Sequence, residues 1–172
     1  MNSVPGTTPR QQTIDDGDGL LLFDADCPFC RRSVRWLLKR ERDDSHLRIT
    51  GLESELSRRL GAHFQVDVER CDSIWYIAEG EIHRDSEALW RLADRLERPW
   101  QTLRAMREIP RPLRDGVYRF IGDHRHRLAM GGSARLEGHE RWANHLSPEL
   151  CRRCGLASDL ADENPEHPSS TP

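Results

Sequence analysis

The chain has 172 residues, which fit one domain with flanking segments, and its mean hydropathy of -0.77 indicates a small core. Its 26 basic and 29 acidic residues give a net charge of -3, so bulk charge favours neither nucleic acid nor an acidic membrane as a partner. No apolar run approaches the roughly 20 residues that span a bilayer, and residues 1–19 lack the apolar core of a secretion signal. We therefore expect a cytoplasmic protein without a membrane or nucleic-acid partner.

The first structured element is predicted to be a short buried strand. Residues 1–19 are rich in Pro, Gly, Gln, Thr and Asp, and this composition predicts a disordered arm. The apolar run that follows predicts a strand over 20–24. Helical spacing of apolar residues then begins, with Cys27 suited to the N-cap and Pro28 to the first helical position.

Strand and helix patterns alternate downstream in the order β-α-β-α-β-β-α. A parallel pair joined by a helix, followed by an antiparallel hairpin, is the topology of a minimal thioredoxin-like sheet. We predict an α/β, three-layer fold of this type with additional C-terminal helices. The predicted elements are a strand at 47–50, a helix at 53–60 ended by Gly61, strands at 73–78 and 81–84 joined by a turn at 79–80, a helix at 87–96 capped by Asp85 or Ser86, and helices at 100–108 and 112–127.

The character of the chain changes after Leu128. Residues 20–128 form the predicted thioredoxin-like domain, and 129–156 form a C-terminal extension that is weakly helical over 134–150. Residues 157–172 are acidic and rich in Pro and Ser, which predicts a disordered tail.

Five cysteines are too few, and too oddly numbered, for a disulfide-stapled secreted domain. Cys27 and Cys30 form a CxxC motif between a strand and a helix, which is typical of a thioredoxin-like redox pair. The helix N-terminus favours a thiolate on Cys27, the predicted attacking thiol. Cys30 lies one turn on and faces inward, so we expect it to be less exposed and to act as the resolving thiol.

Other polar residues have competing interpretations. Asp24 either accepts the proton of Cys30 during resolution or shapes the turn. The basic segment 124–127 is interpreted as a solvated helix face.

Cys71 is interpreted as a small apolar residue. Cys151 and Cys154 form a second CxxC that is a redox relay, two zinc ligands or an idle pair, and we favour a relay or no role over zinc.

Three segments resemble the DCC family of thiol-disulfide oxidoreductases. Leu-Phe-Asp-Ala-Asp-Cys-Pro-Phe-Cys at 22–30 is similar to its Asp-x-x-Cys-x-x-Cys signature, 84–89 to its Ser-x-Ala segment and 109–118 to its late block. The resemblance covers about 20–128 and implies a thioredoxin-like fold with disulfide-reductase activity. Two features depart from the pattern: the second CxxC replaces a short tail with a single Cys, and 71–73 holds no proline ahead of the third core strand, where thioredoxins carry a cis-proline.

The predicted activity is therefore that of a protein-disulfide reductase or thiol-disulfide oxidoreductase. Its substrate is a protein or low-molecular-weight disulfide. The sequence carries no G-x-G-x-x-G fingerprint, so we expect no NAD or flavin cofactor and a thiol reductant such as glutathione or a thioredoxin-type protein. The alternatives are a thioredoxin-like scaffold that binds structural zinc through its CxxC pairs and a redox-inactive interaction domain.

Overall fold

A four-stranded sheet forms the centre of the fold. The structure, a computed structural model, describes residues 18–68, 73–128 and 134–162. The strand order is β2-β1-β3-β4, with β1 parallel to β2 and antiparallel to β3, and with β4 antiparallel to β3. This is the predicted combination of a parallel pair and a hairpin. The strands are β1 (Asp18–Phe23), β2 (His46–Gly51), β3 (Trp75–Ala78) and β4 (Glu81–Arg84).

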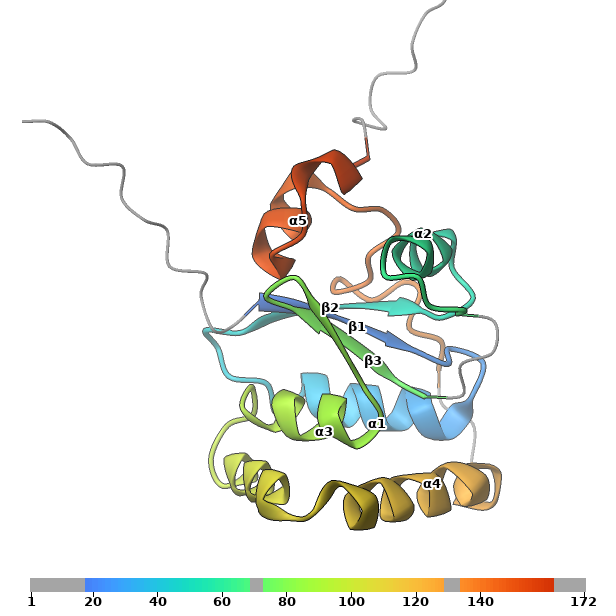
Figure 1. Ribbon diagram of the computed structural model, residues 1–172, viewed down its shortest axis with the longest axis vertical. Helices are drawn as coiled ribbons and strands as arrows, with labels where there is room; N and C mark the ends of the chain where they lie inside the picture. Colours follow the sequence, from blue (N-terminus) through green and yellow to red (C-terminus); the bar gives the residue numbers. More distant parts are fainter. Residues whose placement is uncertain (1–17, 69–72, 129–133, 163–172) are drawn as a thin grey trace, which may run out of the picture.

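Helices cover both faces of the sheet (Figure 1). On one face lie α2 and α5, on the other lie α1 and α3, and α4 forms an outer layer beyond α1 and α3. Within the described ranges, no helix is both long and apolar enough to cross a bilayer. The helices are α1 (Pro28–Leu38), α2 (Glu55–His63), α3 (Asp85–Ala93), the 3₁₀ helix η1 (Trp100–Glu108), α4 (Arg111–Leu128), α5 (Pro148–Cys154) and the 3₁₀ helix η2 (Ser158–Leu160).

Alternate side chains of β1 supply two separate cores. Leu20 and Leu22 belong to the core on the side of α2 and α5, whereas Leu21 and Phe23 belong to the core on the side of α1 and α3. Successive side chains of a strand point to opposite faces, so an unbroken apolar run indicates a strand that is buried on both faces. The mixed α/β architecture fits the predicted thioredoxin-like fold.

Both ends of α2 (Glu55–His63, predicted at 53–60) and of α3 (Asp85–Ala93, predicted at 87–96) differ from the predicted ones. Gly61 lies inside α2, which continues to His63, and a Cβ at this glycine would meet Val68 Cγ2 at 2.2 Å. The glycine therefore allows close packing rather than ending the helix. The N-cap of α3 is Arg84, because Ser86 is buried in a network in which its hydroxyl donates to Asp115 and accepts from Arg114 of α4.

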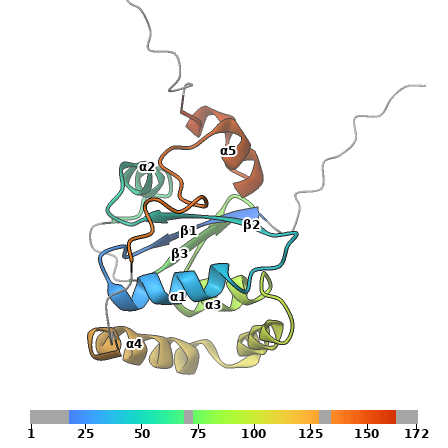
Figure 2. The ribbon, with the colours of Figure 1, turned by 180° about the vertical axis from the view of Figure 1, so that it is seen from behind.

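The C-terminal extension runs along the edge of the sheet before it forms α5 (Figure 2). Ile49 of β2 donates its N–H to Arg141 O at 2.9 Å and accepts from Ala143 N–H at 2.8 Å. This pairing covers the open edge of β2. The sequence predicts weak helix over 134–150, and the structure instead pairs part of this segment with β2. Farther on, Asp162 forms an ion pair with Arg59 of α2, so the ordered chain continues beyond residue 157. Residues 18 and 19, predicted as part of the disordered arm, belong to the strand β1. The rest of that arm and the tail from 163 lie outside the described residues.

We predict that Gly155→Ala destabilises the docking of α5. Gly155 has a left-handed φ of 70°, and a Cβ there would lie 2.6 Å from Gly80 N in the β3–β4 turn. Gly80 N–H also donates to Cys154 O at 2.7 Å. The expected loss in the free energy of unfolding is about 1–3 kcal/mol, measured by urea denaturation.

Gly116→Ala in α4 is the matched control, because a Cβ there meets no described atom within 4 Å. It should leave stability unchanged or raise it by up to about 1 kcal/mol. Equal midpoints for the two variants would contradict the close packing of α5 against the turn.

Candidate active site

Cys27 is the residue at which the chain enters α1. Its backbone is extended (φ -74°, ψ 116°), and Pro28 follows at the start of the helix. The carbonyl of Cys27 accepts the first helical hydrogen bond, from Arg31 N–H at 3.0 Å. Cys27 is therefore the N-cap, as the sequence predicts. The positive end of the helix dipole lies beside its sulfur.

The turn between β1 and α1 is held by one carboxylate and one guanidinium. Asp24 Oδ1 accepts the backbone N–H of Asp26 at 3.1 Å and that of Cys27 at 2.9 Å. Arg31 donates to the carbonyl oxygens of Ala25 at 2.7 Å and of Asp26 at 2.9 Å. The turn-shaping interpretation of Asp24 is therefore observed, and the position of Cys27 is fixed by hydrogen bonds on both sides of the turn.

The exposure of the two thiols is the reverse of the predicted order. Cys27 is 3% exposed, whereas Cys30 is half-buried and lines a pocket. The sequence predicts that Cys30 points into a closed core, because it lies on the apolar face of α1. In the structure, that face also borders the pocket beneath the outer helix α4, so Cys30 keeps access to it.

Cys30 is held in its protonated form by its surroundings. Burial, a side-chain hydrogen bond with Cys27 and the nearby negative charges of Cys27 and Asp24 raise the pKa of Cys30 to about 12, against a smaller opposite effect of Arg125. The two sulfurs and an Asp24 carboxylate oxygen lie within 4.8 Å of one another. Deprotonation of Cys30 is therefore coupled to the charge on its two acidic neighbours.

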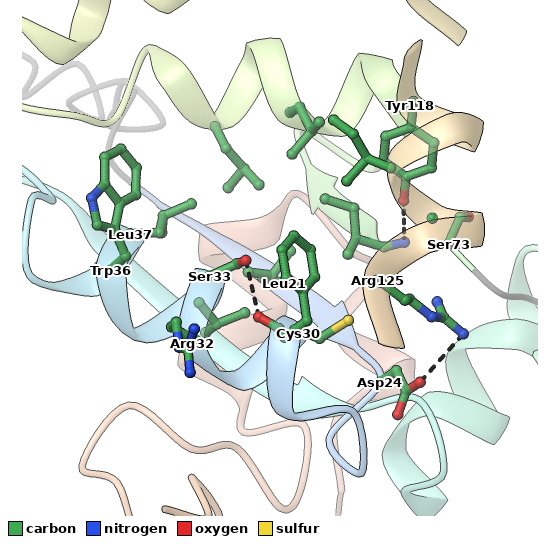
Figure 3. A pocket seen from close by; sticks show the side chains of 17 residues that line it. Leu21, Asp24, Cys30, Arg32, Ser33, Trp36, Leu37, Ser73, Tyr118 and Arg125 are labelled. Atoms are coloured by element: carbon green, nitrogen blue, oxygen red, sulfur yellow. Dashed lines mark hydrogen bonds and ion pairs between the residues drawn. The ribbon is translucent and has the colours of Figure 1, made fainter. Parts of the chain in front are cut away.

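Arg125 of α4 is a site residue that the sequence analysis misses. It was assigned to a solvated face, but its side chain is only 15% exposed and its guanidinium lies 3.6 Å from Asp24 Oδ2 (Figure 3). Histidine and arginine alternate over 124–127, so the sequence pattern does not distinguish Arg125 from its neighbours. Only the stacking of α4 over the start of α1 identifies it.

A pocket of about 470 Å³ adjoins Cys30 and is bounded by α1, α3 and α4. At its edge, Tyr118 of α4 accepts the backbone N–H of Ile74 at 3.1 Å, just ahead of β3. Burial is the main cause that raises the pKa of Tyr118 to about 12, so it remains a neutral phenol at physiological pH. Tyr118 falls within the late block at 109–118, whose resemblance to the DCC family was the one sequence signal for it.

The two CxxC pairs lie on opposite faces of the sheet. Cys151 and Cys154 are fully buried in the core beside α2 and α5, whereas Cys30 packs against the core beside α1. The structure therefore does not assemble the four-cysteine zinc site, nor does it place the second pair in reach of Cys27 for a direct relay. Burial raises the pKa of Cys151, which suits a small apolar core residue. Cys71 lies outside the described residues.

We predict that Cys27→Ser lowers the pKa of Cys30. The substitution removes the thiolate charge that raises it, and an acid titrates more readily when a neighbouring negative charge is removed. The measurement is the pH dependence of the ¹³Cβ chemical shift of Cys30. Cys151→Ala, on the other face of the sheet, is the control and should leave that titration unchanged. An unaltered Cys30 titration in Cys27→Ser would contradict the coupling.

Comparisons with known proteins agree with this geometry. The sequence model of the DCC1-like thiol-disulfide oxidoreductase family matches residues 21–130. The protein named "Uncharacterized protein YuxK" from Bacillus subtilis (strain 168) is 32% identical over 108 residues, which are 63% of this chain and 78% of YuxK. No solved structure gives a significant match. Because the match begins in β1, contains the whole CxxC turn and extends through α4, the chain belongs to the DCC1-like thiol-disulfide oxidoreductase family.

Proposed function

We propose that the chain is a thiol-disulfide oxidoreductase in which Cys27 attacks a disulfide and Cys30 resolves the mixed disulfide. The observation that carries this proposal is the cluster of both sulfurs and an Asp24 carboxylate oxygen, within 4.8 Å of one another at the first turn of α1. Family membership supports a redox role. The different surroundings of the two thiols support their different roles.

In the first step, the Cys27 thiolate attacks one sulfur of a substrate R–S–S–R′. A Cys27–S–S–R mixed disulfide forms, and R′–S⁻ leaves and takes a proton from solvent. Cys27 is the N-cap of α1, so the positive end of the helix dipole lies beside the attacking sulfur. Cys30, whose pKa is raised to about 12, remains a thiol and does not compete for the substrate.

In the second step, Cys30 transfers its proton to the Asp24 carboxylate and attacks the Cys27 sulfur. The Cys27–Cys30 disulfide forms, and R–S⁻ leaves and takes up a proton. Formation of the mixed disulfide has by then removed the charge on Cys27, one of the causes that raise the pKa of Cys30. The first step therefore prepares the resolving thiol for the second.

The oxidised pair must then be returned to the dithiol. Two thiols of an external reductant supply the two electrons and are themselves joined in a disulfide. Glutathione or a thioredoxin-type protein has this chemistry, and both occur in the cytoplasm, where we expect the protein to act. Its substrate is a disulfide of a protein or of a small molecule.

Metal binding is the alternative that one observation favours. Asp24, Cys27 and Cys30 present three donor atoms within 4.8 Å of one another. A closed structural zinc site takes four ligands, typically Cys or His, and Asp24 Oδ1 already accepts two backbone N–H groups. Zinc content per chain after purification separates the two functions, because stoichiometric zinc released only with loss of the fold would favour the scaffold.

We predict that the two active-site cysteine variants fail at different steps. Cys27→Ser should lower disulfide turnover by at least about 100-fold, because the nucleophile is lost. Cys30→Ser should accumulate one equivalent of mixed disulfide on Cys27, detected by mass spectrometry of the intact protein. Cys151→Ala is the control and should retain turnover. A mixed disulfide on Cys30 in the Cys27→Ser variant would reverse the two roles.

We predict that Asp24→Asn slows resolution by roughly 100-fold, the usual scale of general-base catalysis. The amide oxygen of Asn can still accept the N–H groups of the turn, so the fold should persist. The measurement is the decay of a preformed Cys27 mixed disulfide in a single turnover. The exposed neighbour Asp26, as Asp26→Asn, is the matched control. An unchanged decay in Asp24→Asn would restrict Asp24 to its turn-shaping role.

A further inference from the structure

We infer that the substrate is a small disulfide with apolar substituents, which binds in the pocket between α1, α3 and α4. Its sulfurs lie beside Cys30, whose own sulfur is within 4.8 Å of the attacking Cys27 sulfur. The inference rests on the proposed function and narrows it to one substrate class. The pocket volume of about 470 Å³ falls within the roughly 300–1,000 Å³ typical of small-molecule sites.

The walls of the pocket are predominantly apolar. Leu21 forms part of the wall from β1, Trp36 and Leu37 from α1, Leu89 from α3 and Ile121 from α4. An alkyl or aryl substituent that enters this space exchanges water for apolar contacts, which stabilises binding in proportion to the area buried.

Cys30, Asp24 and Arg125 are gathered at one end of the pocket, whereas Arg32 of α1 lies apart from them. Figure 3 shows Cys30, Asp24 and Arg125 close together, with Trp36 and Leu37 at the far end. Arg125 faces Asp24 at 3.6 Å, so this end presents a paired charge. A ligand with its sulfur atoms at this end and an apolar body directed towards Trp36 matches the distribution of lining groups.

One main-chain group that borders the site, the N–H of Ile74, is already paired. Extended polypeptides dock by hydrogen bonding to exposed backbone groups. The backbone N–H of Ile74, which borders the pocket just ahead of β3, donates to the Tyr118 hydroxyl at 3.1 Å. A polypeptide substrate would have to displace this buried phenol, whereas a small disulfide leaves it in place.

The test compares disulfides of similar shape and different polarity. Dipropyl disulfide and bis(2-hydroxyethyl) disulfide differ by a methyl group in place of a hydroxyl at each end. We expect kcat/KM to be roughly 10-fold or more higher for dipropyl disulfide, and to rise roughly threefold for each further methylene that enters the pocket. Insulin with its disulfides intact, as a polypeptide substrate, should give a lower kcat/KM than dibutyl disulfide.

Two substitutions on α4 locate the binding. Ile121 lines the pocket and is 39% exposed, whereas Val117 is 52% exposed and is not among the lining residues. Ile121→Lys should lower kcat/KM for dibutyl disulfide at least about 10-fold, a larger loss than it causes for bis(2-hydroxyethyl) disulfide. Val117→Lys should leave both within about twofold, which separates the pocket from the exposed face of α4.

Equal kcat/KM for the two shape-matched disulfides, a higher value for insulin, or equal effects of the two lysine variants would each overturn the inference. Failure of the proposed function is distinguishable, because wild-type protein would then turn over none of these disulfides. Dibutyl sulfide, an unreactive thioether, is the binding probe in that case. Shifts in the NMR signals of the Trp36 indole and the Ile121 amide would uphold an apolar ligand in the pocket, and their absence would overturn it.

Discussion

A single carboxylate, that of Asp24, joins the end of β1, the start of α1 and the C-terminal part of α4. Hydrogen bonds to a charged group contribute about 1.5–3 kcal/mol each, and Asp24 Oδ1 accepts two from the backbone of the turn. Its ion pair with Arg125, at 3.6 Å and partly exposed, contributes at most about 1 kcal/mol. The turn therefore fixes Asp24, and Asp24 in turn positions Arg125. The two hydrogen bonds hold the CxxC turn, and the weaker ion pair adds one contact between this turn and α4.

The central sheet explains why only one of the two CxxC motifs has active-site surroundings. Because β1 is buried on both faces, it separates a core beside α1 from a core beside α5. Cys27 begins α1 on one side, where a pocket reaches its neighbour Cys30. Cys151 and Cys154 lie in the packed core on the other side and contribute to it as apolar residues. The two CxxC motifs have the same spacing, but they lie on opposite sides of β1 and therefore have different surroundings.

The sequence predicts the features that depend on neighbouring residues. The strand–turn–helix around Cys27, the Glu79–Gly80 hairpin and the order of the elements follow from short-range signals such as an apolar run and Pro28 at a helix start. The sequence does not predict the pocket or the place of Arg125 and Tyr118 beside it. The pocket forms only when α4 stacks beyond α1 and α3. The same packing of α4 beyond α1 forms the pocket that Cys30 lines, so Cys30 is not enclosed in the core as the sequence predicts. Gly61 is misread for a related reason, because its partner Val68 lies outside the helix.

The burial of Cys27 and the apolar pocket belong to one physical arrangement. Cys27 is 3% exposed and does not line the pocket, so the proposed substrate reaches its sulfur from beside Cys30, within 4.8 Å of it. Apolar substituents carry a disulfide into such a space at little cost, whereas polar ones must give up their hydrogen bonds with water. Desolvation also keeps Cys30 protonated until the charge on Cys27 is lost. In the proposed mechanism, the exclusion of water that selects the substrate also sets the order in which the two thiols act.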